Sequence, residues 1–187
     1  MTHRVEARRH DFEAGAVVPF VQVDASTQCV VGMTRFMTIR AFVDRVTPYA
    51  VKIGGTWLAA SVQRTRINTE SKLLLLRYVF DVWSVSRVDL KTDRRDDRSR
   101  AAITRISASF EGILRKWQPS VAEREEGRFR DTTMFSIIDE ERPRIAAHFE
   151  HLLGYSTASL RPVGSSRGNH GRGEPWARRV CFSDRGR

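Results

Sequence analysis

A polar loop between a glycine-containing apolar run and a long apolar helix is the feature that most constrains this fold. The run is "YAVKIGGTWL" at residues 49–58, and its two internal glycines predict a bulge or a close backbone approach. The loop "SVQRTRI" follows, and a helix is expected from about Asn68 to Trp83, capped by Asn68 or Thr69. Four consecutive leucines and further apolar residues cover most of its circumference, which predicts a buried helix.

Strand-like and helix-like segments alternate on both sides of this loop. The runs "VVPFVQVD" and "CVVGMTRFMTI" are separated by the turn residues "ASTQ", which predicts an antiparallel hairpin. After the buried helix, the patterns predict a strand, a helix, two strands and a last helix, at residues 86–93, 96–107, 109–117, 129–138 and 139–153.

The positive charge of the chain is concentrated at its C-terminal end. The net charge is +10 over 187 residues, but the stretch from Gly154 onward holds seven arginines against one glutamate and one aspartate. The same stretch contains six of the twelve glycines and has no apolar period, so we expect a folded domain at residues 1–153 and a basic disordered tail at 154–187. The tail arginines leave open a nucleic-acid-binding or ribosome-associated protein.

Several classes of protein are disfavoured by what the sequence contains. No apolar run approaches the ~18 residues that span a bilayer, and the N-terminus lacks the apolar centre of a signal peptide, so a cytoplasmic protein without a membrane partner is expected. Cys29 and Cys181 lie far apart, which argues against a zinc site or a disulfide framework. His148 and His151 lack an evident third ligand, so no metal is expected.

Three segments, taken in order, carry a resemblance to a known family. "KIGGTWLAASVQRTRINTESKLLLLRYVFD", "RVDLKTDRRDDRSRAAITRISASFEGILRK" and "RFRDTTMFSIIDEERP" resemble the GNAT acetyltransferase superfamily, within it the branch of ribosomal-protein N-terminal acetyltransferases. The similarity runs from about Pro19 to Leu153. It implies an α/β (α+β) fold with a mixed, mostly antiparallel sheet flanked by helices. Only about 16 residues precede the first recognisable strand, so the first strand and two helices of a full GNAT domain would be lacking.

The resemblance assigns the loop to acetyl-CoA, the cosubstrate of this family. In GNAT proteins the pattern Gln/Arg-x-x-Gly-x-Gly/Ala wraps the pyrophosphate with backbone N–H groups, a task suited to a helix N-terminus. The corresponding residues here are Gln63, Arg64, Thr65, Arg66, Ile67 and Asn68. Arg66 stands where the family has glycine. It would either strain the loop and weaken binding, the reading we favour, or contact a phosphate through its guanidinium.

The resemblance also assigns catalytic roles, with departures. A backbone amide near Trp57 or Leu58 would hold the oxyanion, and Ser99 would protonate the departing thiolate. Ser99 also reads as an ordinary first-turn serine, and Asp96 takes the place of a family asparagine. Lys52 stands where the family carries a glutamate that serves as general base, and a protonated lysine cannot take that role.

Three classes of function follow from these observations. The first is an acetyl-CoA-dependent N-acetyltransferase that acts on a primary amine, either a protein N-terminus or a small molecule. The second is a degenerate, non-catalytic GNAT-like protein, because Lys52 and the missing elements predict weak or no transfer. The third is the basic binding protein already described. Glu111, Asp131 and Glu140 are candidate substitute bases, and nothing in the sequence selects one or names the acceptor or the oligomeric state.

Overall fold

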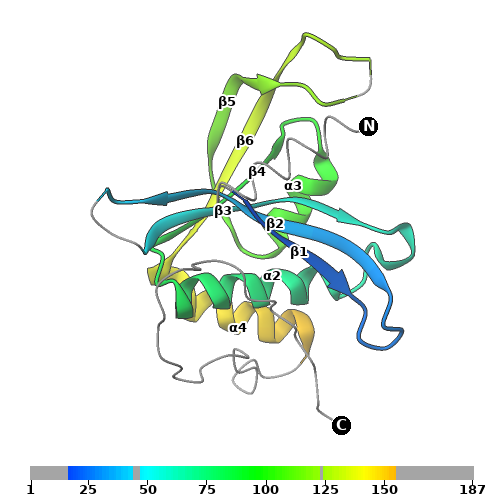
Figure 1. The fold of residues 1–187 in the computed structure, drawn as a ribbon, viewed down its shortest axis with the longest axis vertical. Coiled ribbons are helices and arrows are strands. Elements are labelled where there is room, and N and C mark those ends of the chain that lie inside the picture. Colours follow the sequence, from blue (N-terminus) through cyan, green and yellow to red (C-terminus); the bar gives the residue numbers. More distant parts are fainter. Residues whose placement is uncertain (1–16, 44–46, 123, 155–187) are drawn as a thin grey trace.

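The computed structural model describes residues 17–43, 47–122 and 124–154. The expected tail, except Gly154, and the 16 residues before the first strand lie outside this part of the chain. The elements in chain order are β1 (Val17–Val23), β2 (Val30–Ala41), β3 (Pro48–Leu58), η1 (Ala60–Val62), α2 (Ile67–Arg77), η2 (Tyr78–Val82), β4 (Arg87–Asp93), α3 (Asp97–Arg105), β5 (Ser109–Pro119), β6 (Phe129–Ile138), η3 (Asp139–Glu141) and α4 (Arg142–Leu153). Figure 1 labels the strands and the α-helices.

The strands form one six-stranded sheet in the order β1-β2-β3-β4-β6-β5. All neighbouring pairs are antiparallel except β3 and β4, which run parallel. The β1–β2 hairpin and the order of all later elements were predicted from the pattern, and the mixed α/β fold with a mostly antiparallel sheet is confirmed. A parallel pair needs a long crossover connection, which η1, α2 and η2 provide here.

The core lies between one face of the sheet and helices α2 and α4, which run side by side in Figure 1. The sheet contributes alternate residues, as a half-covered sheet does, and the helices contribute their inward stripes. Its buried members include Phe36, Val51, Ile53, Val88, Leu90, Phe135 and Ile137 from the strands and Leu73, Leu76, Ile145, Phe149 and Leu153 from the helices.

Helix α2 is buried as predicted, but it begins at Ile67, two residues earlier than a cap at Asn68 would allow. Arg66 is its N-cap and makes no side-chain capping hydrogen bond, so the prediction that Asn68 or Thr69 caps the helix is wrong. Beyond Arg77 the helix continues as one π-helical turn, η2. Lys72 lies on the buried side of α2 together with Leu73 and Leu76.

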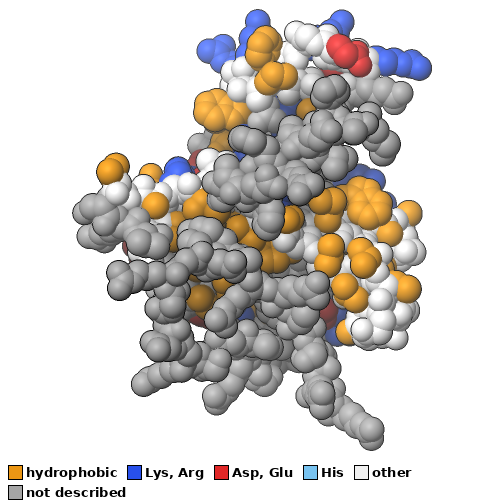
Figure 2. Space-filling model, viewed as in Figure 1, with side chains coloured by type: hydrophobic (Ala, Val, Ile, Leu, Met, Phe, Trp, Pro, Cys, Tyr) orange, Lys and Arg blue, Asp and Glu red, His pale blue; other side chains and the backbone are white. Residues whose placement is uncertain are grey.

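Large hydrophobic side chains are exposed at several places on the described surface. Two groups lie on the β5–β6 hairpin, whose edge strand is β5, and on the β1–β2 hairpin with the end of β3; a third lies where β2 ends and β3 begins, at Phe42, Val43 and Tyr49. Figure 2 shows orange side chains in the first two regions. No helix among the described residues could cross a bilayer.

Candidate functional site

The parallel strands β3 and β4 separate after a short stretch of pairing. Their register covers three residue pairs and ends with Lys52 opposite Asp89. Strand β3 then continues to Leu58 and β4 to Asp93, without pairing to each other. Because the strands are parallel, their carboxyl ends open toward the same edge of the sheet, where helices α2 and α3 begin. This gap between β3 and β4 is the centre of the candidate site.

A bulge in β3 shapes one side of the gap. The register with β2 shifts between the pairs Arg35–Gly54 and Met33–Trp57, which leaves one extra residue on β3. Gly55 lies in the bulge with a φ of 59°, and a Cβ there would meet the Arg35 side chain. The bulge expected from the two glycines is therefore present.

The backbone beyond the bulge distinguishes the two candidates for an oxyanion donor. The Ala59 N–H donates to the carbonyl of Val31 in β2. In an antiparallel pair, every second residue of β3 directs its N–H to β2, and the residues between them direct theirs to the other side. By this alternation the Trp57 N–H faces β2, whereas the Leu58 N–H faces the side from which β4 has separated. Leu58 is thus the better placed of the two predicted amides.

Gln63 connects the loop between β3 and α2 to the end of β3 and to helix α3. Its Nε2 donates to the Leu58 carbonyl at 3.1 Å, and its Oε1 accepts from the Arg98 guanidinium at 2.5 Å. Arg98 belongs to the first turn of α3, so the Arg98–Gln63 hydrogen bond joins the beginnings of α2 and α3. Sequence reasoning missed Arg98, because nothing in the local pattern relates it to a residue 35 positions earlier.

The positive φ of the loop falls at Arg64 and not at Arg66. Arg64 has a φ of 66°, while Arg66 is helical, with a φ of −69° and a ψ of −18°. The expectation that Arg66 occupies a strained glycine position is therefore wrong, because the loop makes its left-handed turn two residues earlier. Arg66 instead faces Glu70 one turn along the helix, at 3.8 Å.

The start of α2 presents polar groups without partners. A helix leaves its first N–H groups unpaired, and α2 lacks a side-chain cap. Thr65 uses its hydroxyl within the loop, donating to the Val62 carbonyl at 2.7 Å, and the Ile67 N–H approaches that hydroxyl at 3.4 Å. The side-chain oxygen of Asn68 has no hydrogen-bond partner among the described residues, but as an acceptor it does not bind an anion. The unpaired N–H groups at the helix N-terminus are the donors that fit an anionic ligand.

Ser99 and Asp96 form a local unit at the start of α3. Asp96 is the N-cap, and its carboxylate accepts from the Ser99 backbone N–H at 2.9 Å and from the Ser99 hydroxyl at 2.6 Å. Burial raises the pKa of Asp96, but these hydrogen bonds outweigh it, and the pKa lies below its ordinary value. The Ser99 hydroxyl therefore already donates its hydrogen to a carboxylate, as a first-turn capping serine does.

Lys52 lies on the sheet face that points away from α2, at the last β3–β4 pair. Val51 and Ile53 belong to the core, so Lys52 points the opposite way. Burial and the nearby Lys91 charge lower the pKa of Lys52 from 10.5 to about 8. The neutral form of this amine is therefore accessible near pH 8, and only that form could accept a proton.

The three carboxylates considered as substitute bases are placed elsewhere or already engaged. Glu111 makes a two-point ion pair with Arg87 at 2.7 and 2.5 Å and accepts from Ser136, and these contacts lower its pKa. Asp131 accepts from the Lys116 backbone N–H at 2.9 Å. Glu140 lines a cavity at the other end of α2. Lys52 is thus the better candidate for a base beside the gap.

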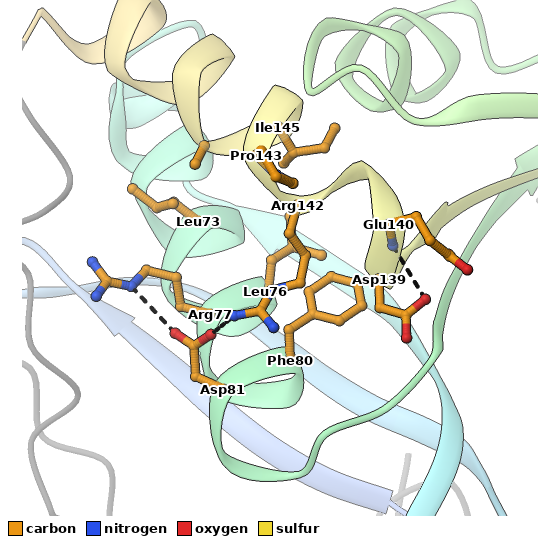
Figure 3. Close-up of a pocket in the computed structure, with 11 residues that line it drawn as sticks. Leu73, Leu76, Arg77, Phe80, Asp81, Asp139, Glu140, Arg142, Pro143 and Ile145 are labelled. Carbon is orange, nitrogen blue, oxygen red and sulfur yellow. Dashed lines mark hydrogen bonds and ion pairs between the residues drawn. The ribbon is translucent and has the colours of Figure 1, made fainter.

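That cavity, of about 560 Å³, lies between the C-terminal half of α2, η2 and the start of α4. In Figure 3 the Asp81 carboxylate stands between the Arg77 and Arg142 guanidinium groups, next to Phe80. The cavity is at the end of α2 opposite to the loop, so it does not belong to the gap between β3 and β4.

The remaining predicted positions take structural roles. The His148 ring nitrogen bonds the Arg105 carbonyl at 2.6 Å, which connects α4 to the end of α3. Within the described ranges, no cluster of three histidine, cysteine or acidic side chains could hold a metal ion. Cys29 is an exposed free thiol, and Cys181 lies outside the described residues.

Comparison with solved structures identifies this arrangement. A GCN5-related N-acetyltransferase from Brucella melitensis is 28% identical, with a TM-score of 0.62, over 73% of this chain and 57% of that one. Mycobacterium smegmatis RimJ, solved in complex with CoA-disulfide, is 23% identical, with a TM-score of 0.62, over 78% and 64%. The ribosomal-protein-S5-alanine acetyltransferase from Vibrio fischeri is 17% identical, with a TM-score of 0.58, over 74% and 70%.

The described part of the chain therefore has the fold of the GNAT acetyltransferases, as the sequence resemblance implied. Its solved neighbours include RimJ and a ribosomal-protein acetyltransferase, which share this fold. The chain spans about three fifths of the length of the Brucella and Mycobacterium proteins. No protein-family model matches the sequence, and no curated protein matches it.

Proposed function

We propose that this chain is an acetyl-CoA-dependent N-acetyltransferase that acts on a primary amine in the cytoplasm. The observation that carries the proposal is the separation of β3 from β4 after Lys52 and Asp89, with the uncapped N-terminus of α2 at the open end. A gap between parallel strands admits an extended thioester, and the helix N-terminus suits its pyrophosphate.

Binding would rest on the loop and on the beginnings of two helices. The N–H groups of Ile67 and Asn68 would face the phosphates, together with the charges of Arg64 and Arg66, both of which are exposed. The Arg98–Gln63 contact fixes the loop against α3. Arg66 has a helical φ and ψ, so the loop would bind the anion with an arginine in place of the family glycine at that position.

The reaction is a transfer of an acetyl group from sulfur to nitrogen. Lys52, as the neutral amine, takes a proton from the incoming ammonium, so that the acceptor attacks with a free electron pair. The Leu58 N–H donates to the carbonyl oxygen as negative charge develops there. As the C–S bond breaks, the attacking nitrogen loses its second proton to solvent. Ser99 turns its hydrogen from the Asp96 carboxylate to the thiolate sulfur, and its oxygen regains a proton from solvent.

The direct test combines ligand binding with transfer. Acetyl-CoA should raise the melting temperature of the full chain, and release of the free thiol should depend on an added amine, with N-terminal peptides and small amines compared as acceptors. Binding without release for any acceptor would favour a non-catalytic GNAT-like protein. No binding at millimolar acetyl-CoA would contradict the proposal.

A further inference from the structure

Lys72 is a buried amine beneath the bulge of β3, and the mechanism above does not use it. Its side chain leaves the middle of α2 and is only 6% exposed. Its Nζ donates to the Thr56 hydroxyl at 2.7 Å and to the Thr34 hydroxyl at 3.2 Å. Three elements, α2, β3 and β2, thus meet at this nitrogen.

No acidic side chain among the described residues balances the positive charge of the Lys72 ammonium. Among the described residues it makes no ion pair, and its third ammonium hydrogen has no hydrogen-bond partner. Burial alone lowers its pKa, from 10.5 to about 7. Lys52 points to the opposite face of the sheet, and no charged side chain of α2, β2 or β3 contributes to the shift. A buried amine with only two hydroxyl partners is a costly feature in a core.

Counting hydrogens determines the direction of the Thr56 hydroxyl. The two threonine oxygens are 3.0 Å apart, so one hydroxyl donates to the other. Thr34 is 1% exposed and has no other acceptor among the described residues, so its hydrogen must go to Thr56. Thr56 then accepts from Thr34 and from Lys72, which fills both of its lone pairs. Its own hydrogen is left to point outward.

Thr56 is the residue at which this buried cluster reaches the surface. It is exposed, and it lies inside the bulge, between Gly55 and Trp57 and two residues before the Leu58 N–H. A hydroxyl whose oxygen accepts from an ammonium is a stronger donor than an isolated one, because the cation polarises it. The cluster therefore presents one polarised donor at the gap between β3 and β4.

We propose that Lys72 and Thr34 orient the Thr56 hydroxyl so that it donates a hydrogen bond to the thioester carbonyl oxygen, adding a side-chain donor to the Leu58 amide. This inference rests on the proposed acetyl transfer. Thr56 acts on the reacting oxygen, whereas Lys72 and Thr34 are positioning residues. The hydrogen bond from Thr56, polarised by the buried ammonium, becomes stronger when the carbonyl oxygen becomes negative. An interaction that is stronger in the transition state than in the ground state lowers the barrier.

The charge state of Lys72 controls the orientation. The ammonium can only donate, so it holds the Thr56 hydrogen outward. A neutral amine has a lone pair and can accept that hydrogen, which would turn the hydroxyl inward. The donor is therefore present at low pH and is lost as pH rises through the pKa of Lys72.

The test compares Thr56→Val with Thr56→Ser and with the control Thr133→Val. Thr133 is a buried threonine of β6 whose hydroxyl has no partner among the described residues. We expect Thr56→Val to lower kcat about 10²-fold with acetyl-CoA affinity nearly unchanged, and Thr56→Ser to retain most of the rate. Thr133→Val should leave kcat unchanged. Lys72→Met should lower kcat similarly and remove the alkaline decline of the rate.

A second measurement does not need turnover. The pKa of Lys72, followed by NMR of its side-chain nitrogen, should rise on adding acetyl-CoA to the wild type and should not respond in Thr56→Val. If the wild type binds acetyl-CoA and Thr56→Val behaves as the Thr133→Val control in both measurements, the proposed role of Thr56 and Lys72 is wrong and the proposed function stands. If the wild type does not bind acetyl-CoA, both proposals fail.

Discussion

Replacing Lys72 with methionine should stabilise the protein at neutral pH. Methionine has a similar length and no charge, and the two threonine hydroxyls can still pair with each other. A pKa lowered from 10.5 to about 7 means that the folded protein holds the ammonium less readily than the unfolded chain does. At ~1.4 kcal/mol for each tenfold difference in proton affinity, the cost at pH 7 is about 4 kcal/mol.

The hydrogen bonds of Lys72 offset part of this cost. Methionine loses the two contacts to Thr34 and Thr56, each worth about 1 kcal/mol. The net expectation is a gain of about 2 kcal/mol in the free energy of unfolding at pH 7, or roughly 4–8 °C in melting temperature.

The dependence on pH has a definite sign. Between pH 7 and pH 10.5 the unfolded chain binds more protons at Lys72 than the folded protein does, so the wild type gains stability as pH rises through this window. The methionine variant lacks that gain. Its advantage should be greatest at pH 6 and should disappear toward pH 10.

Urea unfolding of the wild type and Lys72→Met at pH 6, 7 and 9 measures this difference, because other titrating groups cancel between the two proteins. A methionine variant that is less stable than the wild type at pH 6 would refute the reasoning. Such a result would mean that the ammonium is well compensated inside the fold.

Four further substitutions test the site. Arg64→Gly should raise the free energy of unfolding by roughly 0.5–1 kcal/mol in urea, because it relieves the positive φ; no gain would show that the turn is unstrained. Arg66→Gly should weaken acetyl-CoA binding several-fold in calorimetry, since it removes a charge without relieving strain; tighter binding would contradict this. Lys52→Gln should lower the rate and remove the limb of the pH profile on which the rate rises as Lys52 loses its proton, because the neutral form of Lys52 is the base; an unchanged pH profile would assign the base elsewhere. Ser99→Ala should reduce kcat more than acetyl-CoA affinity, and an equal loss of both would show a purely structural serine.

The sequence patterns predicted the elements well because each is a local periodicity. The alternation in β4 and the apolar run of α2 depend on neighbouring residues, and the structure follows both. The position of the left-handed turn did not follow from the family pattern. Loop geometry depends on where α2 begins. Arg66 is the N-cap of α2 and has a helical φ and ψ, and the positive φ lies at Arg64.

Local sequence patterns could not predict the contact of Lys72 with Thr34 and Thr56. Its partners lie 16 and 38 residues away, on two different strands. A weak signal existed, because Lys72 is three residues from Thr69 and four from Leu76 and so shares their buried stripe. The bulge of β3 places Thr56, which accepts a hydrogen bond from Lys72, and so connects that lysine with the proposed site.

A calorimetric titration of the full chain with acetyl-CoA tests the central claim most directly. We predict saturable binding at one site, weakened as salt concentration rises because phosphate charge is recognised, and reduced in Arg66→Gly. No heat of binding and no rise in melting temperature at 1 mM acetyl-CoA would contradict the account, since the gap between β3 and β4 would then be a feature of the fold without its ligand.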